Sequence, residues 1–206
     1  MTTQARWDAL WRALGATMPP DSVADAMLAA WTEPHRHYHT TQHLAECLAH
    51  LDEARGAAVE PALIECALWF HDAVYVPSRT DNEEKSAEWA SKVAHEAGLD
   101  AAAAARIESL VLVTKHNAHP RTPDEELILD VDLAILGAGA VRFDEYEAQV
   151  RQEFRYVPSI LFKRKRREIL TGFLERPRLY HTPHFFDRFE HPARENLARS
   201  IAQLGG

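Results

Sequence analysis

The chain has 206 residues, of which 46% are hydrophobic and 26% charged, a composition typical of one globular domain and not of a disordered or collagen-like chain. With 23 basic and 31 acidic residues, its formal net charge of −8 disfavours an extended nucleic-acid-binding surface, although a small phosphorylated ligand could still bind in a locally positive pocket. No stretch resembles a membrane-spanning helix or a signal peptide, so we expect a cytoplasmic protein.

Apolar residues recur at helical spacing along most of the chain, and no series of segments alternates with period two. We therefore predict an all-α fold, with one domain over residues 1–206 that has an N-terminal helical extension (1–35) and a C-terminal helical elaboration (142–206). The predicted helices lie, in chain order, near residues 7–14, 21–31, 41–51, 61–75, 81–97, 100–115, 123–136, 143–156, 159–175 and 184–204.

Several residues mark where these helices should begin. Asp21 or Ser22, then Thr40 or Thr41, and finally Asp81 have the side chains that cap helix N-termini, so we expect them to cap the second, third and fifth helices. Pro61 and Pro123 fit the first turn of the fourth and seventh helices.

The 12 histidines are unusual for this length, because histidine is both the commonest metal ligand and the acid or base that works near neutral pH. His39 and His43 are four residues apart, so they can share a helix face. His71-Asp72 follows an apolar run, and a third group is Lys115-His116-Asn117-Ala118-His119. The fourth group, Asp130 and Asp132, lies inside another apolar segment.

A divalent cation would account for polar side chains in such apolar surroundings, since carboxylates and imidazoles that bind a metal are not left with unpaired charge. Mixed histidine and aspartate ligands suit Mn, Fe, Co, Ni, Zn or Mg, and the composition does not choose among them. The two cysteines, Cys47 and Cys66, form no metal-binding cluster in the sequence, so we interpret them as small buried hydrophobic residues in a reducing compartment.

The ordered set His43, His71-Asp72 and Asp132 resembles the H…HD…D pattern of the HD-domain superfamily of metal-dependent phosphohydrolases. The segments YHTTQHL, FHDAVY, DNEEKSA and LDVDLAILG are similar to those of one bacterial subgroup of predicted HD phosphohydrolases. The resemblance implies a helical bundle around one metal ion, or two, with His43, His71, Asp72 and Asp132 as the metal ligands. Asp130 is the alternative to Asp132.

The same resemblance suggests further roles. YHTTQH is similar to the YHN-x-x-H segment of cyclic-nucleotide phosphodiesterases, which would make His39 the general acid, although Thr40 replaces the asparagine. Glu84 could orient the attacking water, and His116 or His119 could bind a second metal or face the substrate. Lys115 and Arg151 are candidate ligands of the substrate phosphate.

We therefore expect a metal-dependent phosphohydrolase that acts on a nucleotide or other small phosphoester, without a membrane or an extended nucleic acid as partner. The sequence has no P-loop and no glycine-rich dinucleotide-binding loop. Two alternatives stay open: an HD-type iron-dependent oxygenase or lyase, and a regulatory module that binds a metal or nucleotide without turnover. The sequence does not give the oligomeric state.

Overall fold

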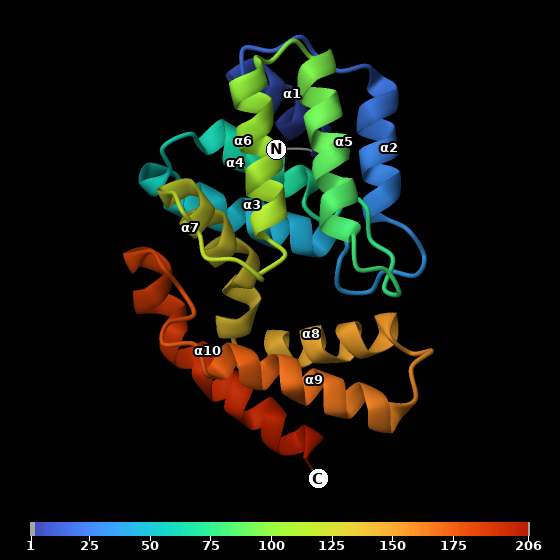
Figure 1. Cartoon of the computed structure of the whole chain (residues 1–206), viewed down its shortest axis with the longest axis vertical. Helices are drawn as coiled ribbons and strands as arrows, with labels where there is room; N and C mark the ends of the chain where they lie inside the picture. The colour runs from blue at the N-terminus through green and yellow to red at the C-terminus, as the bar shows by residue number, and fades with distance from the viewer. Residues whose placement is uncertain (1–2, 206) are drawn as a thin grey trace. The chain divides into compact units, whose positions relative to one another are not determined.

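The computed structural model of the protein describes residues 3–205, and every regular element among them is a helix. The predicted all-α class is thereby confirmed (Figure 1). The chain divides into two compact units, Met1–Ile128 and Leu129–Gly206, called here the first and second units. The division falls within a helix and not near residue 142. The expected single domain with its two additions stays a prediction.

The first unit is built around one helix that is buried on all sides. Its elements are α1 (Thr3–Ala13), α2 (Asp21–Trp31), α3 (Thr41–Ala54), the short 3-10 helix η1 (Arg55–Ala57), α4 (Pro61–Phe70), α5 (Asn82–Glu96), α6 (Ala101–Val113) and the beginning of α7 (Pro123–Asp132). Every residue of α4 from Leu63 to Phe70 is buried, and this helix contacts α1, α3, α5 and α6. A helix that is apolar on all its faces belongs in the interior, so α4 can present its C-terminal end there.

Three of the expected helix starts are confirmed, including Pro123 as the first residue of α7, and two others lack the expected side-chain cap. Pro61 occupies the first turn of α4, and the Thr40 side chain caps α3 by accepting a hydrogen bond from the Gln42 N–H. Asp81 immediately precedes α5, but its side chain makes no capping bond because both carboxylate oxygens accept hydrogen bonds from Arg79. Likewise, α2 begins at Asp21 after Pro20, without a side-chain cap.

The expected ends of two helices were wrong. The fourth helix ends at Phe70 and not near residue 75, so the HD dipeptide lies in the turn that follows α4. The seventh ends as an α-helix at Asp132 and tightens into the 3-10 helix η2 (Leu133–Gly137). In both places the apolar pattern continues past the end of the α-helix, because the residues that follow are buried in a turn or a 3-10 helix.

The second unit surrounds an aromatic core. It contains η2, α8 (Ala140–Glu153), α9 (Ser159–Leu174) and α10 (Pro183–Leu204), and α10 packs against both η2 and α9. Its largest fully buried side chains are Phe143, Tyr180 and Phe185. The Tyr180 hydroxyl donates a hydrogen bond to the Leu133 carbonyl, 2.8 Å away, which connects η2 to the segment before α10.

Gly137 permits the close approach of η2 and α10. A Cβ atom added there would lie 2.6 Å from Phe189 Cβ and 2.7 Å from the Phe189 carbonyl oxygen. We predict that Gly137→Ala lowers the free energy of unfolding by roughly 1–3 kcal/mol, because backbone atoms would have to move. Gly172→Ala is the matched control, because Gly172 lies inside α9 and an added Cβ would meet no other atom. We expect this substitution to stabilise the fold slightly. Urea unfolding that shows equal effects of both variants would contradict this packing argument.

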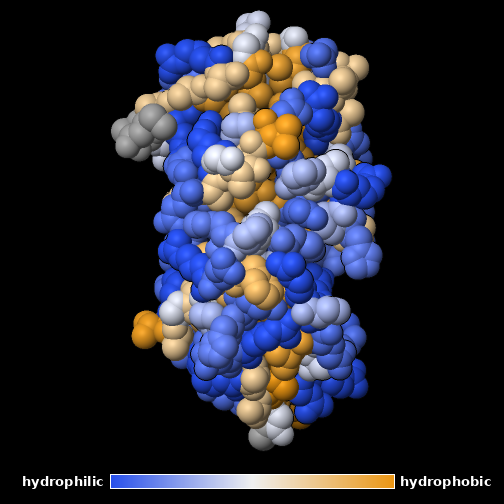
Figure 2. Space-filling view, turned by 90° about the vertical axis from the view of Figure 1, so that its left-hand side faces the viewer, coloured by the Kyte–Doolittle hydropathy of each residue, from blue (hydrophilic) through white to orange (hydrophobic). Residues whose placement is uncertain are grey.

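The surface carries few large hydrophobic side chains. Figure 2 shows a mainly hydrophilic face with separate, small hydrophobic areas. Among the most exposed apolar residues are Val59, Val141 and Ile160, at 69%, 86% and 83% exposure. None of the described helices combines the length and apolar character needed to cross a bilayer.

Candidate metal centre

The end of α4 places His71 in the interior. His71 follows the last helical residue, is 1% exposed, and uses its Nδ1 atom to donate a hydrogen bond to the Leu68 carbonyl at 2.8 Å. A carbonyl acceptor fixes the proton on Nδ1, so the lone pair is on Nε2. This is the arrangement that proteins use to orient a histidine that binds a metal.

His43 approaches His71 from the first turn of α3. Its Nε2 atom lies 3.2 Å from His71 Nε2, and its Nδ1 atom lies 3.0 Å from the hydroxyl of the buried residue Tyr38. The His43 side chain is 2% exposed. Two imidazoles, each held at Nδ1 by a neighbour, therefore direct their Nε2 atoms at one another.

Asp72 completes a group that we call the histidine–aspartate cluster (His43, His71 and Asp72). Its Oδ2 atom lies 3.0 Å from His71 Nε2 and 3.6 Å from His43 Nε2. Burial by itself would raise the pKa of Asp72, but its electrostatic interactions with His71, His39 and His43 and its hydrogen bond with His71 hold this pKa well below its usual range. Asp72 is thus a carboxylate at neutral pH, which is the form that binds a cation.

The donor atoms of the cluster fit a metal ion. Two nitrogens that bind one ion at roughly 2.0–2.1 Å in tetrahedral geometry would lie about 3.3–3.4 Å apart, close to the observed 3.2 Å between the two Nε2 atoms. Without a cation or a proton between them, the two lone pairs would repel each other in a buried site. The nitrogen and carboxylate donors are those that divalent transition metals accept.

A buried arginine, Arg36, connects the loop before α3 to the turn after α4. The Arg36 guanidinium donates to the carbonyl oxygens of Asp72 at 2.6 Å and Ala73 at 3.0 Å, and it is paired with Glu33 at 2.9 Å. Arg36 also donates to the His39 carbonyl at 3.2 Å. This network fixes both segments of the cluster through backbone atoms.

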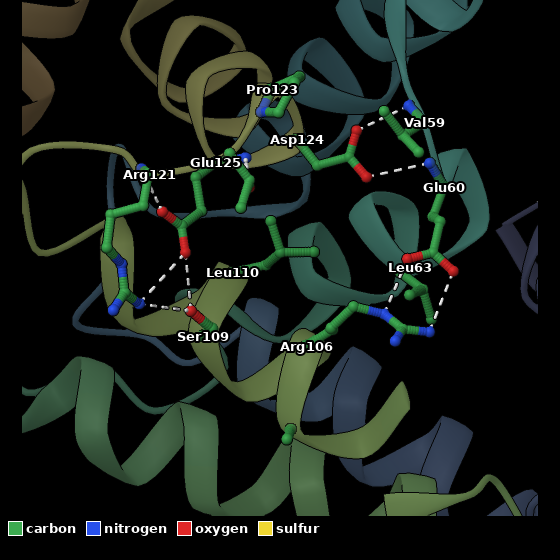
Figure 3. A pocket seen from close by; sticks show the side chains of 12 residues that line it. Val59, Glu60, Leu63, Arg106, Ser109, Leu110, Arg121, Pro123, Asp124 and Glu125 are labelled. Atoms are coloured by element: carbon green, nitrogen blue, oxygen red, sulfur yellow. Dashed lines mark hydrogen bonds and ion pairs between the residues drawn. The ribbon is translucent and has the colours of Figure 1, made fainter. Parts of the chain in front are cut away.

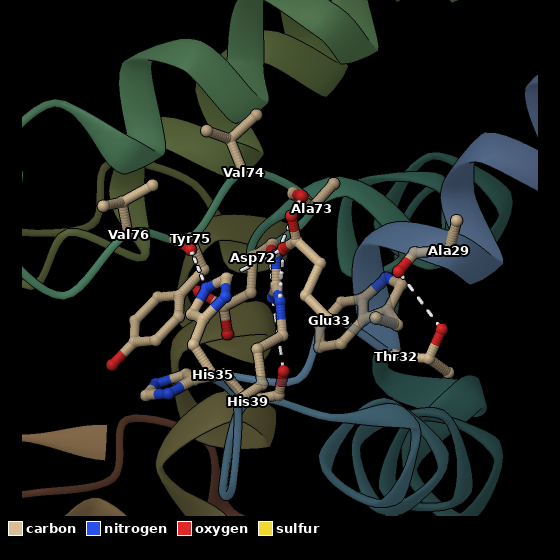
Figure 4. A network of polar contacts seen from close by, with 12 residues as sticks. Ala29, Thr32, Glu33, His35, His39, Asp72, Ala73, Val74, Tyr75 and Val76 are labelled. Carbon is tan, nitrogen blue, oxygen red and sulfur yellow. Dashed lines mark hydrogen bonds and ion pairs between the residues drawn. The ribbon is translucent and has the colours of Figure 1, made fainter.

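His39, the expected general acid, lies beside the cluster. Its ring stacks on Tyr75 with centroids 4.1 Å apart and packs edge-on against Tyr38 at 4.9 Å. Figure 4 shows His39 and His35 next to the Tyr75 ring. His39 is half-buried, and its charge acts on Asp72. Its catalytic role stays a prediction.

Cys47 is the candidate ligand that the sequence analysis missed. The side chain is 1% exposed, as expected of a small hydrophobic residue, but its Sγ atom lies 3.6 Å from His43 Nδ1 and 3.7 Å from His43 Nε2. Potential ligand atoms of Cys47, His43 and His71 lie within 4.8 Å of one another. The first unit therefore contains a buried group of two histidines and one cysteine that could contribute to a metal site. The spacing of His43 and Cys47, four apart on α3, was the available signal.

Of the two aspartates near the end of α7, Asp130 is occupied by hydrogen bonds within the second unit. It is fully buried and accepts hydrogen bonds from the His181 N–H at 2.8 Å and from the Thr182 N–H and hydroxyl, both at 2.7 Å. Asp132, the last residue of α7, is half-buried. The donors around Asp130 favour Asp132 as the ligand, and that assignment stays a prediction.

Glu84 and Lys115, both expected near the substrate, form an ion pair with each other. The hydrogen bond from Lys115 lowers the pKa of Glu84, and Lys115 also donates to the Thr80 carbonyl at 3.0 Å. The neighbouring Glu83 is the carboxylate that responds to the cluster: burial raises its pKa, and the negative charge of Asp72 adds to this effect. Sequence reasoning chose between these two glutamates without knowing which face of α5 each occupies.

The remaining predicted residues lie in turns or donate hydrogen bonds to backbone carbonyls. His116 follows α6 with a left-handed backbone, φ 56°, and is half-buried, whereas His119 is exposed. Arg151, in the second unit, donates to the carbonyls of Phe154 and Val157 at 2.7 and 3.1 Å, so its guanidinium closes the end of α8. Their roles toward a substrate stay predictions.

A pocket of about 440 Å³ contains several of these side chains. Its lining includes Glu84, Lys115, Asn117, His119 and Arg121. Glu125 lines it as well, and the two basic side chains are paired with the two glutamates: Lys115 with Glu84 and Arg121 with Glu125. The role of Lys115 toward a substrate phosphate stays a prediction, and its partner in the structure is Glu84.

The largest described pocket of the first unit, about 540 Å³, is separate from the histidine–aspartate cluster and shares no lining residue with it (Figure 3). Its floor includes Leu63 and Leu110, and its polar groups are already paired. Arg106 forms an ion pair with Glu60 at 2.7 Å, and Asp124 accepts from the backbone N–H groups of Val59 and Glu60. Asp124 thus fastens the start of α7 to the start of α4.

Comparison with known proteins gives no relative: no protein-family model matches the chain, and no significant match occurs among the curated proteins or the solved structures. The functional argument therefore depends on the geometry of the site and on the resemblance of its motifs.

Proposed function

We propose that this chain is a metal-dependent phosphohydrolase of the HD-domain type, acting on a nucleotide or another small phosphoester. The observation that carries the proposal is the histidine–aspartate cluster, in which both Nε2 atoms and the Asp72 carboxylate converge within 3.6 Å. Buried groups of this kind are stable in an apolar interior when they share a cation. The motif resemblance then assigns that cation to phosphoester hydrolysis.

Asp132 is proposed as a further ligand of the same ion. It is the last residue of α7 and is half-buried. Asp130, two residues earlier, already accepts four hydrogen bonds, so we propose Asp132 as the ligand of the two. A divalent ion held by these residues would polarise a phosphoryl oxygen and lower the pKa of water at neutral pH.

The chain's own residues would supply the other parts of the reaction. Water attacks phosphorus, the bond from phosphorus to the ester oxygen breaks, and protonated His39 gives its proton to the leaving oxygen. The stack on Tyr75 and the edge contact with Tyr38 orient His39 for this role. Lys115 would bind a phosphate oxygen after releasing Glu84, which would cost little because the pair is partly exposed.

Metal removal tests the proposal. We expect the protein as purified to contain a divalent metal, chelation to stop phosphate release from a panel of nucleotides and small phosphoesters, and readdition to restore it. The metal should also stabilise the fold by about 2.7 kcal/mol at a concentration one hundred times its Kd. Metal analysis measures the bound ion, and thermal unfolding measures the stabilisation. A metal-containing protein that consumes oxygen but releases no phosphate from any nucleotide or phosphoester of the panel would instead support the iron-dependent alternative.

A further inference from the structure

Cys47 lies on the same face of α3 as His43. The two residues are four apart, so their side chains are neighbours along the helix, and both are buried. The Sγ atom lies 3.7 Å from His43 Nε2, the atom that faces His71. The Sγ atom is nearly equidistant from the two ring nitrogens of His43, at 3.6 and 3.7 Å. The potential ligand atoms of Cys47, His43 and His71 all lie within 4.8 Å of one another, which brings the sulfur within reach of a cation shared with the two imidazoles.

The other cysteine shows what a purely structural thiol looks like in this protein. Cys66 lies in the middle of α4, fully buried, and burial together with the negative charge of Glu65 raises the pKa of its thiol far above the usual value. It therefore stays a protonated, apolar side chain. Cys47 differs because its sulfur contacts the imidazole of His43.

We propose that the thiolate of Cys47 is a ligand of the metal held by His43 and His71, so that the site takes a cation that accepts sulfur, such as Zn²⁺ or Fe²⁺, in preference to Mg²⁺. The inference rests on the metal binding of the proposed function and narrows its metal. Thiolate is a soft ligand that suits zinc and iron, whereas Mg²⁺ requires oxygen ligands and loses its water reluctantly. A site with one thiolate and two imidazoles would bind Mg²⁺ poorly.

The histidine contacts agree with this assignment. When Nε2 of His43 binds a metal, its Nδ1–H donates to the Tyr38 hydroxyl oxygen at 3.0 Å. The hydrogen bond from His71 Nδ1 to the Leu68 carbonyl directs His71 Nε2 toward His43 Nε2 and the Asp72 carboxylate. Both imidazoles thus present the nitrogen nearest the shared centre, and Cys47 adds sulfur from the adjacent turn of α3.

Cobalt(II) titration of the metal-free full-length protein tests the assignment spectroscopically. We expect bound Co²⁺ to give visible d–d bands and, in addition, a strong near-ultraviolet sulfur-to-cobalt charge-transfer band. Cys47→Ala and Cys47→Ser should lose the charge-transfer band and weaken Zn²⁺ binding by roughly tenfold or more, since even residues that only support metal ligands contribute about that much. Cys66→Ala, the matched control, should keep the band.

The outcomes separate this inference from the proposed function. Visible d–d bands without the charge-transfer band would overturn the assignment of Cys47 and leave the histidine–aspartate site intact. Failure of the wild-type protein to bind Co²⁺, Zn²⁺ or Mg²⁺ would overturn both proposals. Mass spectrometry of the alkylated wild-type protein gives a readout that does not depend on folding of a variant. Zn²⁺ should slow the alkylation of Cys47, and an unchanged rate would contradict the assignment.

Discussion

Replacing Asp72 by asparagine is expected to lower phosphate release by at least about 100-fold and to reduce the bound metal to a small fraction of the wild-type amount. The substitution removes the negative charge whose Oδ2 atom lies 3.0 Å from His71 Nε2 and 3.6 Å from His43 Nε2. It leaves the turn intact, because Arg36 binds the backbone carbonyl of Asp72 and not its carboxylate. The loss should therefore be one of chemistry, with little change in the thermal midpoint of the metal-free protein.

Asp81→Asn is the matched control for this prediction. Asp81 is also an aspartate that follows a loop in the first unit, but its side chain is 45% exposed and pairs with Arg79. An exposed pair of this kind contributes about 0–1 kcal/mol, so the control should keep both metal and activity. Metal analysis and phosphate release would be measured on the same preparations. Equal phosphate release by wild type and Asp72→Asn would assign the activity to another site or to a contaminant.

The sequence could predict the helices of this protein because burial and periodicity coincide along most of the chain. In α3 the apolar positions Leu44, Leu48 and Leu51 are all buried, and the Thr40 cap forms as expected. The pattern fails where an apolar run continues beyond the helix. Near His71 the apolar run predicts more α-helix, but the chain turns there. The His71 side chain bonds to the Leu68 carbonyl, and Arg36 bonds to the Ala73 carbonyl in the turn.

The candidate site was predictable in part, because its residues follow motifs in the sequence. His43, His71 and Asp72 come together as the motif implies, although 28 residues separate the two histidines. Cys47 was not found, because an isolated cysteine in an apolar pattern has the same sequence signature whether it faces a core or a metal. Likewise, only the orientation of α5 decides which of the adjacent residues Glu83 and Glu84 faces Asp72.

The choice between Asp130 and Asp132 leads to the second large effect, this time on stability. Asp130→Ala should lower the free energy of unfolding by roughly 3–5 kcal/mol, because it removes a buried carboxylate and leaves buried donors without an acceptor. Those donors are the backbone N–H groups of His181 and Thr182, together with the Thr182 hydroxyl. Urea denaturation would measure the effect. Asp144→Ala, which loses only an exposed pair with Arg199 in the same unit, should change little.

Asp132→Ala should show the opposite pattern from Asp130→Ala. We expect it to lose bound metal and phosphate release while its metal-free form unfolds near the wild-type urea concentration, since the proposed role of its carboxylate is to bind the ion. The two neighbouring aspartates would then be separated by function: one holds the segment before α10 in place, and the other binds the cation. If Asp130→Ala unfolds at the wild-type midpoint but loses its metal, the assignment is reversed and Asp130 is the ligand.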